Sequence, residues 1–398
     1  MRFQARKRLG TILLAIAAAA ATAGVPAAAS AAAQPSPVVG QVYVNDNTTG
    51  TNTIGVLDRH ADGTLTPRAG SPFTAGGAGT GTGLASQGAL QISPDGRFLI
   101  AVDAGSNQLS VLRIRPDGTL QSASGSPVAS DGIDPVSIAV HQGLVCIANA
   151  GPGNSAGDTN YTGFTLNAGG RLRPIPDSTY VLPNDSKPGQ VLFSGDGTRL
   201  AGTRIASSQI DSFTVGSDGL LTLAPGSPYD AQAFSPPQGY GQLGSEFSPT
   251  NPDELFVSDA HTAAGGAAFP GLVSSFNDAA DGTLTAVGAP VANDGGASCW
   301  IEISHDGNFL FVVNTASASI SSYSIGDGGA LTFLQSTGAG QIGAGAEDAR
   351  LSPDGSTLWV VESGTDAVTG FTVNGGTLTP LSAAAGPLGA TPSGIVVN

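Results

Sequence analysis

Polar side chains recur where short apolar runs of the sequence end. Amides, carboxylates and a guanidinium at such places can bind or activate a small ligand. If each run is one strand of a repeated unit, these residues form a ring around a channel. Alternatively, Asp and Asn simply begin the next loop, because their side chains can hydrogen-bond the backbone; Arg204 has no such turn role. The ring would comprise Asn45, Asp103, Asn149, Arg204, Asp259, Asn314 and Glu362.

A second polar set lies on predicted strands that begin each repeat. Asp348 and Arg350 are two positions apart, so on a strand they point the same way, and a structural pair is favoured over a catalytic one. Glu246 and Glu302 could form a carboxylate pair, whose chemical role would depend on their separation. Gln190 completes this set. The candidate ligand-binding residues are therefore Asp103, Asn149, Gln190, Asn314 and Glu362.

The histidines differ in their expected surroundings. His60, His141 and His305 fall on predicted turns, whereas His261 lies two residues after Asp259, near the expected channel. If the protein is an enzyme, its catalytic group is predicted to be Asp259, His261, Glu246 and Arg204. Histidines and cysteines are scattered singly, so neither a metal site nor another cofactor is expected.

Two glycine-rich motifs are interpreted as loops. Gly153–Gly157 matches Gly-x-Ser-x-Gly, but the strained turn of a serine nucleophile leads into a helix, and no helix is predicted at this point of the chain. Gly79–Gly83 resembles a phosphate loop, but a strand follows where that loop requires a helix. Residues 73–88, rich in Gly, Thr, Ala and Ser, are predicted to form a flexible surface loop.

A repeated β-hairpin is the element that positions these residues. Its clearest copy, Gln91–Gly105, contains a short apolar strand, a Pro-Asp-Gly turn and a second apolar strand. Proline presets φ and glycine accepts a positive φ, so the chain reverses there at little steric cost. Further copies begin at Ala139, Phe193, Phe247, Ile303 and Leu351.

A second turn recurs between these hairpins. Seven such turns, roughly 45 to 60 residues apart, match the period of propeller blades. The sequence therefore predicts an all-β, seven-bladed β-propeller with four-stranded antiparallel blades. Residues 392–398 resemble an inner strand and Gln41–Asn45 the strand after it, so the N- and C-terminal strands should close the ring. The turns begin at Asp62, Asp117, Gly169, Asp218, Asp281, Gly328 and Gly375.

The first 33 residues are predicted to be a secretory signal peptide. Basic residues at 2–8 precede the apolar run Ile12–Ala21 and an Ala31–Ala33 cleavage site. The run is too short to remain as a membrane anchor. Residues 34–398 should thus form one exported, extracellular and monomeric propeller domain.

The charge of that domain limits its partners. It would carry 11 basic and 30 acidic residues, a balance that repels nucleic acid and anionic membranes. The expected partner is a small molecule, such as a lactone or sugar-like ligand, or another extracellular molecule. A Cys146–Cys299 bridge would have to join different blades, so a buried, unbridged Cys146 is the simpler expectation.

The repeat Ser-Pro-Asp-Gly-x-Phe-Leu, with Asp-Gly-Thr-Leu turns between its copies, resembles the seven-bladed propeller lactonase family over Gln41–Asn398. That family includes propeller-type 6-phosphogluconolactonases and carboxymuconate-lactonising enzymes. The repeat also occurs in other secreted propellers, so it indicates the fold better than the chemistry.

The resemblance implies where a family active site would lie. The family's acid–base histidine aligns with Gly189, its anion-binding arginines with Leu243 and Thr315, and its glutamate with Ala260, beside Asp259. A proton-transfer group typically accelerates the catalysed reaction by roughly 10² to 10⁴, and positively charged groups that stabilise the transition state contribute comparable factors. With these groups replaced, we expect a ligand- or partner-binding scaffold. The alternative is a lactone hydrolase with a different site at the channel mouth.

Overall fold

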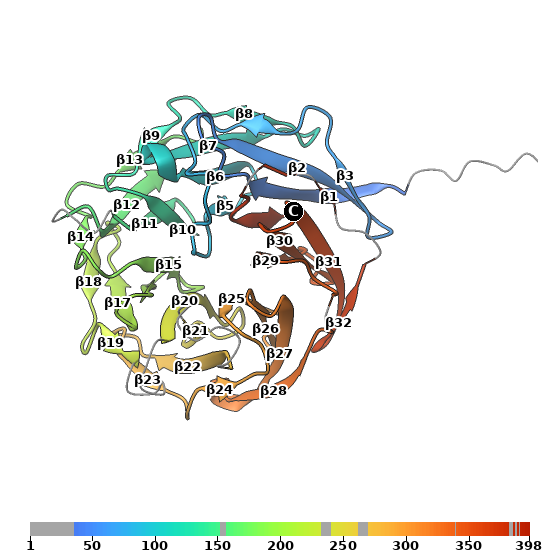
Figure 1. Ribbon diagram of the computed structural model, residues 1–398. Coiled ribbons are helices and arrows are strands. Elements are labelled where there is room, and N and C mark those ends of the chain that lie inside the picture. Colours follow the sequence, from blue (N-terminus) through green and yellow to red (C-terminus); the bar gives the residue numbers. More distant parts are fainter. Residues whose placement is uncertain are drawn as a thin grey trace, which may run out of the picture. The chain divides into compact units, whose positions relative to one another are not determined.

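The computed structural model describes residues 36–151, 157–231, 240–261, 270–338, 340–381, 385–386, 388–389 and 391–398. Strands in these ranges form seven antiparallel sheets, which Figure 1 shows set around a common centre. The predicted all-β, seven-bladed propeller is confirmed. No helix within the described ranges is long and apolar enough to cross a membrane.

Each sheet is one blade, in which the strands follow one another from the centre outwards. Blade 1 contains β33 (Ile395–Val397), β1 (Val38–Asn45), β2 (Thr53–His60) and β3 (Leu65–Pro67). Blade 2 contains β5 (Leu90–Ile92), β6 (Phe98–Asp103), β7 (Gln108–Ile114) and β8 (Leu120–Ser122). Blade 3 contains β10 (Pro135–His141), β11 (Leu144–Asn149), β12 (Asn160–Leu166) and β13 (Leu172–Pro174). Blade 4 contains β15 (Pro188–Phe193), β16 (Arg199–Arg204), β17 (Gln209–Val215) and β18 (Leu221–Leu223).

The remaining blades follow the same order. Blade 5 contains β20 (Tyr240–Phe247), β21 (Glu254–His261), β22 (Leu272–Asp278) and β23 (Leu284–Ala286). Blade 6 contains β25 (Ser298–Ile303), β26 (Phe309–Asn314), β27 (Ser319–Ile325) and β28 (Leu331–Ser336). Blade 7 contains β29 (Ala346–Leu351), β30 (Thr357–Glu362), β31 (Ala367–Asn374) and β32 (Thr377–Pro380). Blades 1–5 add a short outer strand: β4 (Phe73–Thr74), β9 (Val128–Ala129), β14 (Tyr180–Val181), β19 (Tyr229–Asp230) and β24 (Val291–Ala292).

A serine and an aspartate fix the hairpin turn between the two inner strands of a blade. In blade 7, Ser352 Oγ donates to Asp354 Oδ1 at 2.5 Å and accepts the Thr357 N–H at 3.0 Å. The Ser352 hydrogen bond is the main reason why the pKa of Asp354 falls to about 2. Blades 2, 4 and 6 repeat these bonds with Ser93, Ser194 and Ser304. The turn therefore fixes the depth at which each inner strand ends.

The two ends of the described chain close the ring. In blade 1, β33 pairs with β1 through Val42–Val397, Tyr43–Val396 and Val44–Ile395. The inner strands of adjacent blades also contact one another all the way round, from β33 through β5 to β29 and back to β33. The predicted closure by N- and C-terminal strands is confirmed, and no inner strand is left at an open gap.

The hydrophobic core lies between neighbouring blades. Phe98 and Val102 of blade 2, for example, share one buried cluster with Ile147 and Phe164 of blade 3. Burying each such side chain stabilises the fold by about 1.5–3 kcal/mol. Cys146 and Cys299 are buried in separate blades and are not bridged. The proposed signal peptide and most of the Gly153–Gly157 motif lie outside the described residues.

Candidate functional site

Backbone N–H groups on the inner edges of the blades face the centre, where they have no neighbouring strand. Between blades 3 and 7, side chains of one blade accept these N–H groups from the next. We call these acceptors, Ser137, Gln190, Glu246 and Glu302, the inner girdle. They accept, in that order, the N–H of Val191 at 3.2 Å, Ser245 at 2.5 Å, Ile303, and Leu351 at 2.8 Å.

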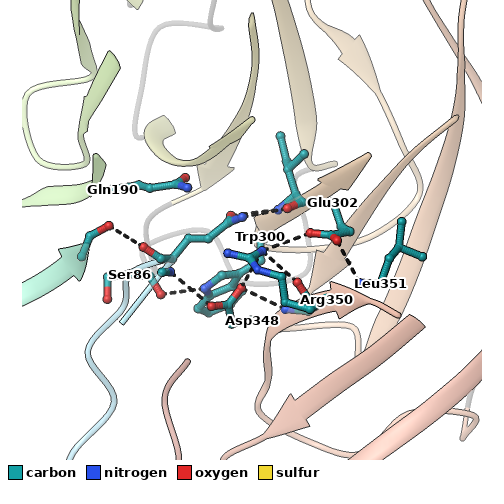
Figure 2. A network of polar contacts seen from close by, with 12 residues as sticks. Ser86, Gln190, Trp300, Glu302, Asp348, Arg350 and Leu351 are labelled. Atoms are coloured by element: carbon teal, nitrogen blue, oxygen red, sulfur yellow. Dashed lines mark hydrogen bonds and ion pairs between the residues drawn. The ribbon is translucent and has the colours of Figure 1, made fainter. Parts of the chain in front are cut away.

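Gln87 fills the middle of the ring. Its Nε2 donates to the Ile301 carbonyl at 2.7 Å, and its Oε1 accepts the Ile301 N–H at 3.0 Å. Its backbone bonds to blades 3 and 4, through Ser137 Oγ and the Gly189 carbonyl. Figure 2 shows the adjoining contact, in which Trp300 Nε1 donates to the Ser86 carbonyl at 2.7 Å. This short segment therefore joins blades on opposite sides of the ring.

The prediction of a flexible surface loop over residues 73–88 is wrong for its last part. Ser86 and Gln87 are only 3% and 1% exposed. The Gln87 amide can be buried because it hydrogen-bonds both the N–H and the carbonyl of Ile301. Gly244 makes room for this contact, since a Cβ there would lie 2.3 Å from Gln87 Oε1. Because Ser86 and Gln87 occupy the centre of the ring, the space at the hairpin end of the inner strands is separated from the loop end.

A polar cavity of about 250 Å³ occupies that end. Its lining includes Gln87, Gln91, Gln190, Glu246, Glu302 and Arg350, with apolar walls from blades 3 and 4. Gln91, Glu246, Glu302 and Arg350 each occupy the next-to-last position of their inner strand. The cavity thus opens beside the Pro-Asp-Gly hairpins, at the opposite end of the inner strands from the predicted ring of strand-end residues.

A buried charge network forms one wall of the cavity (Figure 2). Arg350 Nη1 lies 3.1 Å from Glu302 Oε2 and 3.5 Å from Asp348 Oδ1, so the predicted pairing of Asp348 with Arg350 is confirmed. Burial raises the pKa of Glu302 and of Asp348, while the Arg350 guanidinium opposes both shifts. Burial, reinforced by the Glu302 charge, raises the pKa of Glu246 well above its usual range.

Some polar atoms at the cavity have no hydrogen-bond partner among the described residues. Glu246 Oε2 is buried without one. Gln190 is only 4% exposed. Its Oε1 accepts hydrogen bonds from the N–H and the hydroxyl of Ser245, while its Nε2 is bonded to no described group. The Gln91 amide is half-buried and also lines the cavity. Figure 2 shows Gln190 pointing toward the charge network. Buried polar groups are normally satisfied, so the buried Glu246 Oε2 points to a bound ligand or water.

Of the residues predicted to be catalytic, Arg204, Asp259 and Glu246 do not converge. Arg204 forms a two-point ion pair with Asp211 in its own blade, at 2.7 and 2.5 Å. Asp259 pairs with Gln242 near the loop end of β20, whereas Glu246 lies near its hairpin end, roughly 10 Å away at strand spacing. Asp259 is 1% exposed, and burial raises its pKa to about 6. His261 ends β21, and its side chain lies outside the described residues.

The predicted ring of strand-end residues is buried rather than exposed around a channel. Asp103 accepts hydrogen bonds from Asn52 and Ser110, and Asn149 donates to Asn160. Asn314 bonds three serines, and Glu362 accepts the Gly343 N–H and the Thr365 hydroxyl. These bonds hold the strand-end side chains against neighbouring strands and loops, so the side chains do not line an open channel. Gln190 is the proposed ligand-binding residue that lines the cavity.

The loop end of the inner strands is apolar by contrast. Leu243, Ala260 and Trp300 belong to one buried hydrophobic cluster, with Ile205 packed against it. Thr315 Oγ1 donates to the Ala346 carbonyl at 2.8 Å. A charged ligand entering at this end would meet few free polar groups among these residues.

Glu347 provides a test of burial near this end. It is 8% exposed, and burial raises its pKa to about 7 from 4.5. The folded state therefore holds a proton that the unfolded state releases, so stability should fall as pH rises from about 4.5 to about 7. Over this pH range, the free energy of unfolding of Glu347→Gln should fall by about 2–3 kcal/mol less than that of the wild type. Urea unfolding at several pH values measures this difference. An unchanged pH slope would contradict the burial of an ionisable Glu347.

The fold and the site together define a seven-bladed β-propeller with a polar cavity at one end of its centre. Residues 250–396 match the family model described as lactonase, 7-bladed beta-propeller. The resemblance to the lactonase propellers is thereby confirmed. No curated protein matches the chain in sequence.

Solved structures share this fold at low sequence identity. A putative 6-phosphogluconolactonase from Bacteroides fragilis is 19% identical, with a TM-score of 0.68 over 90% of this chain and 98% of that chain. The periplasmic gluconolactonase of Pseudomonas aeruginosa is 18% identical, with a TM-score of 0.69 over 90% and 98%. A hypothetical selenium-binding protein from Sulfolobus tokodaii reaches 0.61 at 10% identity, over 91% and 94%. At these identities the likeness shows the fold alone.

Proposed function

We propose that this protein binds one small polar molecule, a sugar-like compound or its lactone, in the cavity at the hairpin end of the ring. The observation that carries the proposal is a space of about 250 Å³ lined by the amides of Gln91 and Gln190 and by Glu246, whose buried Oε2 has no described partner. This volume corresponds to roughly eight water molecules. Hydroxyl groups both donate and accept, so a polyhydroxylated ligand can satisfy amides and a carboxyl group together.

The loop end of the ring supports binding over the family reaction. The positions that align with the family's acid–base and anion-binding residues are Gly189, Leu243, Ala260 and Thr315. Leu243 and Ala260 are buried among apolar side chains, and the Thr315 hydroxyl is bonded to the backbone. These groups offer neither a proton donor nor a positive charge for a phosphorylated lactone. As an exported protein, the propeller would meet its ligand outside the cell.

Hydrolysis of a neutral lactone in the same cavity is the second candidate. A carboxyl group with a raised pKa, a carboxylate and a guanidinium border one space there, which is the combination that acid–base catalysis uses. Glu246 would be the proton donor, and Glu302, held by Arg350, the base that activates water. In the principal proposal the same groups only orient the ligand.

Calorimetric titration with D-glucose and D-glucono-1,5-lactone tests the principal proposal. Gln91→Ala should weaken binding roughly threefold to tenfold, the effect of losing one ligand hydrogen bond. Gln121→Ala, on the exposed outer strand β8, is the matched control and should leave binding unchanged. Equal affinities of Gln91→Ala and the wild type would contradict the assigned site.

Lactone hydrolysis is the second readout. We expect negligible turnover of 6-phosphogluconolactone by residues 34–398. Turnover of the neutral lactone that Glu246→Gln abolishes without loss of binding would establish the hydrolase alternative instead. Robust turnover of the phosphorylated lactone would contradict the claim that the family site is replaced.

A further inference from the structure

Acidic groups outnumber basic groups around the cavity. Glu246 and Glu302 line it, Asp348 lies directly behind, and Arg350 is the cation of this network. Three carboxyl groups therefore share one guanidinium. Resting on the proposed function, we infer that the natural ligand of this cavity is a small organic cation, a protonated amine that also carries hydroxyl groups.

Two of the three carboxyl groups accept donor bonds that oppose the rise in their pKa caused by burial. Glu302 accepts the Leu351 N–H at 2.8 Å and the Arg350 guanidinium at 3.1 Å. Asp348 accepts the backbone N–H groups of Gly88 at 3.2 Å and Ala349 at 3.0 Å. Donor bonds of this kind favour the ionised carboxylate. With both groups ionised and Arg350 balancing one of them, the network carries one negative charge before Glu246 is counted.

A bound cation would supply the partner that Glu246 lacks. One of its oxygens accepts the Ile303 N–H, and its Oε2 is buried at the cavity without a described partner. An ionised Glu246 would add a second uncompensated negative charge, which, together with burial, raises its pKa and favours the protonated carboxyl group in the empty cavity. An ammonium group beside Oε2 would replace that proton, and the Gln91 amide oxygen is a further acceptor for its N–H donors.

The surrounding groups favour an organic amine over other ligands. Among the described residues, no three His, Cys, Asp or Glu side chains are placed to hold a metal ion. The amides of Gln91 and Gln190 suit the hydroxyl groups of such an amine. An anionic sugar acid or sugar phosphate would instead bring like charge against Glu302 and Asp348, which is unfavourable in a partly buried site.

The replacement of the Glu246 proton by the ammonium group of the ligand makes ligand binding depend on pH. The charged groups acting on Glu246 are Glu302 on β25 and Asp348 and Arg350 on β29. Because the pKa of Glu246 is raised in the empty site, amine binding below that pKa releases a proton. Affinity should therefore rise with pH up to the pKa of Glu246 and then level off, until the amine itself loses its proton.

The test compares D-glucosamine with two neutral analogues, D-glucose and N-acetyl-D-glucosamine, by calorimetry in two buffers of different ionisation enthalpy. We expect glucosamine to bind about tenfold more tightly, or better, with proton release to the buffer. Glu246→Gln should lower the affinity for glucosamine to that for glucose and abolish the proton release. Asp327→Asn, the same charge change at an exposed residue of blade 6, should alter neither.

The possible failures are distinguishable. Equal affinities of glucosamine and glucose, both weakened by Gln91→Ala, would overturn the cationic ligand and leave the proposed function standing. No binding of any of the three sugars would overturn both. Tighter binding of sodium or calcium chloride alone than of glucosamine would replace the amine by an inorganic ion and contradict the inference.

Discussion

Deleting residues 393–398 is expected to abolish the cooperative unfolding transition. The deletion removes β33, which pairs with β1 through Val42, Tyr43 and Val44, and it opens the ring between blades 7 and 2. The buried Ile395 and Val396 are lost with it. The combined cost is comparable with a domain's whole stability of about 5–15 kcal/mol. Differential scanning calorimetry of both proteins measures the outcome.

Asn398→Ala is the matched control for this deletion. It keeps the strand and removes only the side-chain bonds to the Gln41 N–H and the Tyr43 hydroxyl. Its cost should be about 1–2 kcal/mol, so the transition persists at a slightly lower temperature. A truncated protein that unfolds cooperatively at the wild-type temperature would show that β33 does not close the ring.

Arg350→Met is expected to destabilise the protein by about 3–5 kcal/mol at neutral pH. The substitution leaves Glu302 and Asp348 buried without their cation. The penalty should shrink as pH falls, because the pKa values of both carboxyl groups are raised and protonation removes the unpaired charges. Urea unfolding at several pH values measures both effects.

Arg97→Met is the matched control for this substitution. Arg97 pairs with Asp95 at 2.6 Å, but both side chains are 48% exposed. An exposed pair contributes only about 0–1 kcal/mol, so this variant should unfold almost like the wild type. Equal losses in the two variants would contradict a buried, structurally required network at the centre of the ring.

The blades could be predicted from the sequence because their signals are local. The Ser-x-Asp-Gly turn forms its bonds within six residues, as Ser352, Asp354 and Thr357 show, and each copy marks one hairpin. Closure by the C-terminal strand was predicted because residues 392–398 resemble an inner strand and Gln41–Asn45 the strand that follows one. Long-range contacts carried no such signal: Gln87 bonds to Ile301, 214 residues away, so its burial could not be inferred from a glycine-rich surrounding.

The site was predicted only in part for a related physical reason. Strand-end polar residues such as Asp103 and Asn314 are already hydrogen-bonded within their own or the neighbouring blade. The more informative position is the second residue before the turn serine, occupied by Glu246, Glu302 and Arg350 in consecutive blades. Charge at this position, two residues before the turn serine, marks a group that lines the central cavity.

The location of a bound ligand tests the central claim most directly. The measurement is a crystal structure of residues 34–398 soaked with D-glucosamine and, separately, with D-glucono-1,5-lactone. Our account predicts ligand density at the hairpin end of the ring, in contact with Gln91, Gln190 and Glu246. Density at the opposite end instead, beside Asp259 and Arg204, would contradict it.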